Sequence, residues 1–111
     1  MSEPTDEDRR AQADIAARLA QVGFVLPGTL LERNMRCGKP RCRCKADPPR
    51  LHGPYHQWTR KIDGKTVTRR LTAEQVEIYG PWFDQARQLR DLLDQLETLS
   101  LRIYERNQNS P

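Results

Sequence analysis

The strongest constraint on the fold is an Asp63-Gly64 pair that separates two β-prone runs, 56–62 and 65–71. Asp-Gly favours a two-residue type I′ turn, because both turn residues take positive φ angles there. Such a turn predicts an antiparallel hairpin in which residue i pairs with residue 127 − i. A further strand is predicted over 29–36, so we expect a small three-stranded antiparallel sheet.

The hairpin register predicts two chemically different faces. Residues two apart in a strand share a face, and one face of this hairpin carries Trp58, Ile62, Val67 and Leu71. We expect this apolar face to cover the core. The opposite face is rich in hydroxyl, amide and basic groups, which suits contact with phosphates and base edges. Its candidate nucleic-acid-binding residues are Gln57, Thr59, Lys61, Thr66, Thr68 and Arg70.

Helices are predicted before and after the sheet in the sequence. Apolar residues at three- and four-residue spacings predict an amphipathic helix over 6–22. A Thr72–Gln75 capping box opens a short helix over 73–79, and Gly80-Pro81 is expected to break it. A long helix follows over 81–105, with a disordered tail over 106–111. The expected architecture is therefore a single small α+β domain spanning residues 1–111.

The long helix carries an apolar stripe. Its members are Trp82, Ala86, Leu89, Leu93, Leu96 and Ile103, with Leu92 and Leu99 widening it. We expect the stripe to pack within the chain. The alternative is a coiled-coil-like seam between two copies, which would make the protein a homodimer.

The positive charge is concentrated in the middle of the chain. Residues 28–71 carry twelve basic and three acidic side chains, a net charge of +9. The segments before and after them, 1–27 and 72–111, have net charges of −2 and −3. Such a segment attracts polyanions, of which nucleic acid is the commonest. A solvated basic surface without a ligand is the alternative. The coincidence of the charge with a predicted sheet favours nucleic-acid binding.

All three cysteines lie within eight residues of one another, in an irregular loop over 37–54. With His52 they form the pattern C-x4-C-x-C-x7-H, from Cys37, Cys42 and Cys44. Three thiolates and one imidazole are a common ligand set for structural zinc, and four protein ligands leave no open position for catalysis. We therefore predict one structural Zn²⁺. His56 is the alternative fourth ligand, and three reduced surface thiols are the alternative without metal.

Several classes of protein are disfavoured. The sequence lacks paired carboxylates in a cleft-like context, a phosphate-binding glycine loop and a Ser/His/Asp arrangement, so we expect no enzyme. The polar N-terminus lacks the features of a signal peptide, and no apolar run is long enough for a membrane span, so a cytoplasmic location is expected. A protein-interaction adaptor that dimerises through the long helix remains an alternative function. RNA binding, with Tyr55 and Trp58 as stacking residues, is another.

The segments MRCGKPRCRC and HGPYHQWTRKIDGKTVTRRLT resemble a small bacterial family of unknown function. Its members typically read CGKPxCRC and then HGPYY, and they are often encoded near transposases and other mobile elements. The resemblance implies little about mechanism, and a regulator or accessory factor of a mobile element is the hypothesis that this setting favours. The order of elements is also similar to the three-stranded sheet at the N-termini of tyrosine recombinases, which lies in the DNA major groove. That analogy implies double-stranded DNA as the partner of the polar hairpin face, with Arg41 and Arg43 reaching flanking phosphates.

Overall fold

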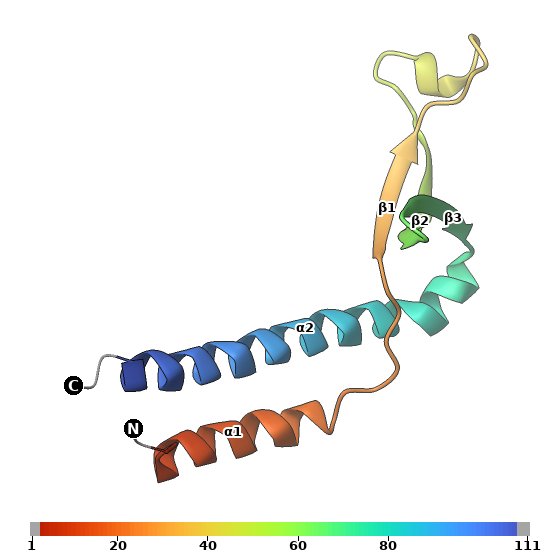
Figure 1. Cartoon of the computed structure of the whole chain (residues 1–111). Helices are drawn as coiled ribbons and strands as arrows, with labels where there is room; N and C mark the ends of the chain where they lie inside the picture. The colour runs from red at the N-terminus through yellow and green to blue at the C-terminus, as the bar shows by residue number, and fades with distance from the viewer. Residues whose placement is uncertain (1–2, 109–111) are drawn as a thin grey trace. The chain divides into compact units, whose positions relative to one another are not determined.

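The computed structural model describes residues 3–108, which form two helices, three strands and one 3-10 turn (Figure 1). In chain order these are α1 (Asp6–Leu19), β1 (Thr29–Met35), η1 (Arg43–Lys45), β2 (His52–Ile62), β3 (Lys65–Leu71) and α2 (Ala73–Gln108). The predicted α+β class, with an N-terminal helix, a three-stranded antiparallel sheet and a long C-terminal helix, is confirmed.

The chain forms two compact units. The helical unit contains α1 and the part of α2 from Asp84 onward, and the sheet unit comprises Leu26–Phe83. The sheet unit carries twelve basic and five acidic residues, a net charge of +7, while the remainder of the chain carries seven basic and ten acidic residues, −3. The basic character of the chain therefore belongs to the sheet unit.

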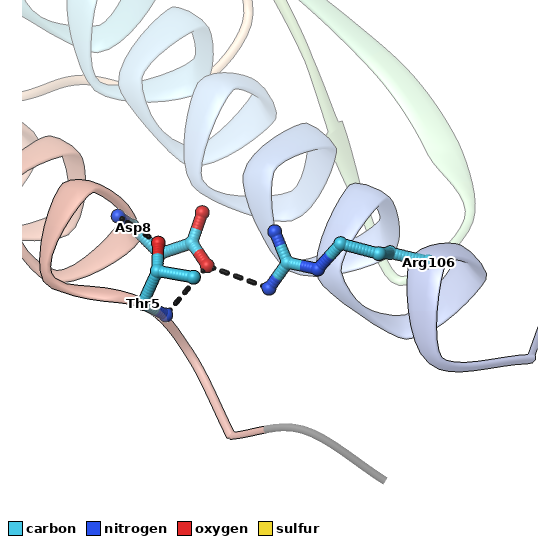
Figure 2. A network of polar contacts seen from close by, with 3 residues as sticks. All are labelled: Thr5, Asp8 and Arg106. Atoms are coloured by element: carbon cyan, nitrogen blue, oxygen red, sulfur yellow. Dashed lines mark hydrogen bonds and ion pairs between the residues drawn. The ribbon is translucent and has the colours of Figure 1, made fainter. Parts of the chain in front are cut away.

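A capping box starts α1. The Thr5 hydroxyl accepts a hydrogen bond from the Asp8 N–H at 3.1 Å, and the Asp8 carboxylate accepts one from the Thr5 N–H at 2.9 Å. Arg106 of α2 donates to the same carboxylate at 2.7 Å (Figure 2). The Arg106 hydrogen bond and the Thr5 N–H lower the pKa of Asp8 to about 2. Residues near the two ends of the described chain are thus joined by one ion pair.

The C-terminal end of α1 lies earlier than predicted. The helix ends at Leu19 and not at residue 22, because the backbone tightens into a turn. The N–H groups of Gln21 and Val22 donate to the carbonyls of Arg18 and Leu19, three residues back, at 3.1 Å each. Val22 nevertheless packs against the core of the helical unit.

The core of the helical unit lies between α1 and α2. Ile15 of α1 and Leu92 and Leu99 of α2 are its buried residues. Leu19, Val22, Leu96 and Ile103 pack around them. The buried side of α2 therefore includes Leu92 and Leu99. Leu93, which was predicted to belong to the apolar stripe, is 50% exposed.

α2 continues through Pro81, where we predicted a break between two helices. A proline inside a helix costs about 3 kcal/mol, because it removes one backbone donor and crowds the preceding turn. Packing just beyond the proline opposes this cost: Phe83 is 3% exposed and its ring meets that of Trp58 edge-on at 5.8 Å. The helix also extends to Gln108, so residues 106–108 of the predicted tail are helical. Residues 109–111 of that tail lie outside the described residues.

The strands are ordered β1-β2-β3, and both neighbouring pairs are antiparallel. The hairpin register is the predicted one, from His56 opposite Leu71 to Ile62 opposite Lys65. Asp63 and Gly64 both have positive φ angles, 51° and 79°, as the predicted turn requires. β2 begins at His52, earlier than expected, so the end of the predicted irregular loop is part of the sheet.

One face of the sheet packs on the start of α2 within the sheet unit. Trp58 contacts Phe83, and its ring N–H donates to the Pro27 carbonyl at 2.8 Å. Val67 and Leu71 share this face and are half-buried. Ile62 was also predicted to be core, but it is 41% exposed because it lies at the hairpin tip. No described helix has both the length and the apolar character needed to cross a membrane.

Candidate metal centre and adjoining sheet face

The pairing of β1 with β2 brings the two ends of the cysteine loop together. Met35, the last residue of β1, pairs with His52, the first residue of β2. Cys37 follows β1 by two residues, so it starts close to His52. The loop then turns back through η1, which carries Cys44 (Figure 1).

The four predicted ligands lie in one cluster. The sulfur atoms of Cys37, Cys42 and Cys44 and a ring nitrogen of His52 are all within 4.8 Å of one another. Cys42 Sγ lies 3.0 Å from His52 Nε2, and Cys37 Sγ lies 3.6 Å from Cys44 Sγ. Ligands bound to one tetrahedral zinc at 2.0–2.3 Å are separated by roughly 3.3–3.8 Å. These residues can therefore hold a metal ion.

The other histidine lies elsewhere. His56 pairs with Glu32 on β1 and with Leu71 on β3, which places it on the sheet face that carries Trp58. It does not belong to the cluster formed by the described Cys and His residues. His52 is thus the imidazole of this candidate site.

Neighbouring donors stabilise negative charge on the most buried thiol. Cys44 is fully buried. The Cys37 N–H donates to its sulfur at 3.3 Å, and Lys45 Nζ lies 3.7 Å away. These contacts, with the backbone donor foremost, lower the pKa of Cys44 to about 6. At Cys37 the Lys39 N–H lowers the thiol pKa, but burial and the sulfurs of Cys42 and Cys44 outweigh it and raise that pKa.

The donor set defines which ions fit. Thiolates and imidazole bind zinc and other borderline or soft metals, whereas magnesium and calcium prefer oxygen ligands. Four protein ligands complete a tetrahedron and leave no open coordination position. A metal ion bound by all four residues would link the two ends of the loop between β1 and β2.

The second candidate site is the sheet face opposite Trp58, which we call the Thr59 face. Its members alternate along all three strands: Thr29, Leu31, Arg33, Tyr55, Gln57, Thr59, Lys61, Thr66, Thr68 and Arg70. All six hairpin residues that we predicted to bind nucleic acid belong to it. Lys61, Thr66, Thr68 and Arg70 are exposed, and Gln57 and Thr59 are half-buried.

Two side-chain contacts order the Thr59 face. The hydroxyls of Thr59 and Thr68 lie 3.2 Å apart across the strands. The guanidinium carbon of Arg70 lies 4.0 Å from the centre of the Tyr55 ring. Arg33 and Leu31 share the face but were not singled out in the sequence, because the register of β1 against β2 could not be read from it.

A depression of about 350 Å³ connects the candidate metal centre with the Thr59 face. It is lined by three of the four candidate ligands together with Met35, Arg36, Lys39, Tyr55 and Arg70. Arg41 and Arg43, predicted to reach phosphates, are exposed on the cysteine loop. The depression therefore joins the start of the cysteine loop to the Thr59 face, and its lining includes the cations Arg36, Lys39 and Arg70.

The fold and the site together define a small α+β protein with a three-stranded sheet and a Cys₃His cluster at one end of it. Residues 5–80 match the model of a family described as a domain of unknown function, DUF6788, and the chain belongs to this family. The match includes α1, all three strands and the four cluster residues. No curated protein and no solved structure matches the chain.

Proposed function

We propose that this protein is a non-enzymatic, zinc-stabilised DNA-binding protein that contacts duplex DNA with its Thr59 face. The observation that carries the proposal is the composition of that face. Its ten residues include Arg33, Lys61 and Arg70, four threonines and a glutamine, and none is acidic. An exposed sheet surface of this kind offers hydrogen-bond donors and positive charge without a competing carboxylate.

The proposed roles of these residues in DNA binding follow from their positions. Lys61 and Arg70 on the sheet, with Arg41 and Arg43 on the cysteine loop, bind phosphates and set the orientation of the protein. Gln57 and the threonine hydroxyls reach base edges. A two-stranded β-ribbon fits the major groove, where each base pair presents a distinct pattern of donors and acceptors.

Zinc supports this role by ordering the cysteine loop. Zn²⁺ with three thiolates has a net charge of −1. The loop that carries the cysteines also carries four cations, Lys39, Arg41, Arg43 and Lys45. The loop therefore stays basic when the metal is bound. Metal binding supplies folding free energy, and without it the loop has few apolar side chains to hold it together.

The biological setting that we propose is a regulator or accessory factor of a mobile element. This part rests on the resemblance of the CGKPRCRC and HGPY segments to a family whose members are often encoded near transposases.

A second candidate is an adaptor that dimerises through α2. Leu93, Leu101 and Tyr104 are 50%, 58% and 59% exposed, and they surround an open depression on the helical unit. Such a dimer would present two copies of the sheet unit. RNA binding is a third candidate, since every nucleic acid offers phosphates to the same cations.

The proposal is tested with a charge-reversal variant of the Thr59 face. Lys61→Glu combined with Arg70→Glu should weaken binding to a labelled duplex by at least about tenfold, because two phosphate contacts become repulsive. Fluorescence anisotropy at low salt measures the loss, and circular dichroism checks that the variant is folded. Arg90→Glu combined with Arg102→Glu, on exposed positions of the helical unit, changes the net charge equally and is the matched control.

The control variant should bind almost as tightly as the wild type. Equal losses in the two variants would show that only net charge matters, and would overturn the assignment to the Thr59 face. Tighter binding to single-stranded RNA than to duplex DNA would favour the RNA alternative.

A further inference from the structure

We infer that the depression between the metal centre and the Thr59 face receives one unpaired nucleotide of a bound DNA strand, whose base stacks on Arg70. The inference rests on the proposed function and makes it more specific. It assigns the protein to DNA that has an unpaired base next to a duplex, such as a single-stranded extension.

The stacking platform is the Tyr55–Arg70 pair. The Arg70 guanidinium lies over the Tyr55 ring, with its central carbon 4.0 Å from the ring centre. Tyr55 is half-buried and Arg70 is exposed. A planar guanidinium has two faces, so the face turned away from Tyr55 is available to a base. Stacking on arginine and aromatic planes is a common way in which proteins hold unpaired bases.

The other aromatic–arginine pair of the sheet, Trp58 with Arg60, cannot serve this purpose. Trp58 contacts Phe83 through its ring and is covered by Arg60, whose guanidinium carbon lies 4.2 Å from the ring centre. Its ring N–H is occupied by the Pro27 carbonyl. Trp58 is therefore part of the packing, and the stacking role falls to Tyr55 and Arg70.

The depression beside the platform has the size and charge for a nucleotide. Its volume of about 350 Å³ lies at the lower end of the range for small-molecule sites. Arg36, Lys39 and Arg70 are its three cations, and none of its described lining residues is acidic. Arg36 and Lys39 are placed to bind the phosphate of a nucleotide whose base lies on Arg70.

The position of the depression connects it with the duplex-binding surface. Tyr55 and Arg70 belong to the Thr59 face, and Cys37, Cys42 and His52 of the candidate metal centre also line the depression. A strand that leaves a duplex on the Thr59 face would reach the depression directly. The cysteine loop would then line the nucleotide site as well as contact phosphates.

The test compares three DNA probes with the zinc-loaded full chain at one low salt concentration. These are a blunt duplex, the same duplex with a short single-stranded extension, and the extended duplex with 2-aminopurine as its first unpaired base. The extended duplex should bind at least about fivefold more tightly than the blunt one, and the fluorescence of the 2-aminopurine should fall on stacking.

A pair of conservative variants isolates stacking from charge. Arg70→Lys keeps the positive charge but removes the planar group, so it should abolish the preference for the extended duplex and the fluorescence change. Its matched control is Arg90→Lys, which makes the same change at an exposed position of the helical unit and should leave both in place. Free deoxyadenosine monophosphate, added in excess as a competitor, should not remove the preference for the extended duplex. The free nucleotide lacks the phosphate contacts that the duplex makes with the protein.

The outcomes separate this inference from the proposed function. Binding of both duplexes with equal affinity, or an unchanged preference in Arg70→Lys, would overturn the nucleotide site while leaving duplex binding intact. Loss of the preference with the free nucleotide would show a site for mononucleotides and would overturn its assignment to a DNA strand. Failure to bind any of the three probes would overturn the proposed function itself.

Discussion

His52 Nε2 lies 3.0 Å from Cys42 Sγ although the two residues are ten positions apart in the sequence. The contact depends on the strand pairing of Met35 with His52, which brings the end of the loop back to its beginning. The sheet thus supplies one fixed imidazole, and the loop supplies three thiols around it. This arrangement explains how a loop with few apolar residues closes.

The first prediction concerns metal content. Protein purified without chelators should contain about one zinc per chain, because three thiolates and one imidazole complete a tetrahedral site. His52→Ala should lower the retained zinc to well below one equivalent after dialysis. His56→Ala is the control and should leave the content unchanged, since His56 lies outside the cluster. The zinc content is measured by elemental analysis. Wild-type protein with almost no metal would contradict the prediction.

Removal of the metal should loosen the cysteine loop selectively. We expect a chelator to increase the rate of tryptic cleavage after Arg41, Arg43 and Lys45 by about tenfold or more, because metal binding supplies the folding free energy of the loop. The helical signal in circular dichroism should change little, since Ile15, Leu92 and Leu99 hold the helical unit without the loop. Mass spectrometry of the first fragments identifies the cleavage sites. First cleavage in α1 would argue against a local role of the metal.

The pKa of Asp8 predicts how stability depends on acid. This carboxyl has a pKa of about 2 in the folded state, below its ordinary value of 3.8, because Arg106 and the Thr5 N–H stabilise its charged form. Its contribution to stability is therefore present above about pH 4 and is lost as the pH falls toward 2. Thermal unfolding of Asp8→Asn should show a lower melting temperature than the wild type at pH 6, and the two curves should converge near pH 2.

Asp14→Asn is the control for this prediction. Asp14 pairs with Arg18 at 3.2 Å, but its side chain is 70% exposed, so the pair adds little to stability. A difference between wild type and Asp8→Asn that stays constant from pH 6 to pH 2 would rule out the proposed role of the charge.

Local signals in the sequence were enough to predict the hairpin and the ligand cluster. The Asp63-Gly64 turn determines the register of β2 and β3, because few residue pairs accept two positive φ angles. The spacing of the cysteines was informative because three thiols and a histidine in one short segment favour a common cluster, and the structure brings these four side chains together.

Features that depend on distant packing were not accessible from the sequence. Pro81 is a local breaking signal, but contacts such as that of Phe83 with Trp58 hold α2 together through it. The stacking of Arg70 on Tyr55 likewise depends on how two strands twist against each other. The capping box at Thr5 and Asp8 was present in the sequence as a T-x-x-D pattern and could have been recognised.

The helical core predicts a sharp contrast between two adjacent leucines. Leu92→Ala should destabilise the protein by about 2–5 kcal/mol, because Leu92 is 2% exposed and its removal leaves a cavity. Leu93→Ala should change stability by less than about 0.5 kcal/mol, because Leu93 is 50% exposed. Urea unfolding of both variants gives the comparison. A large, concentration-dependent loss in Leu93→Ala would instead support a homodimer through α2.

The most direct test of the central claim is the affinity of the zinc-loaded protein for duplex DNA across a series of salt concentrations. Four cations, Lys61, Arg70, Arg41 and Arg43, are assigned to phosphates. The logarithm of the association constant should therefore fall with the logarithm of salt concentration with a slope of about −3 to −4. Binding that does not depend on salt, or no binding at the lowest salt concentration, would contradict the claim that the Thr59 face and the cysteine loop bind DNA.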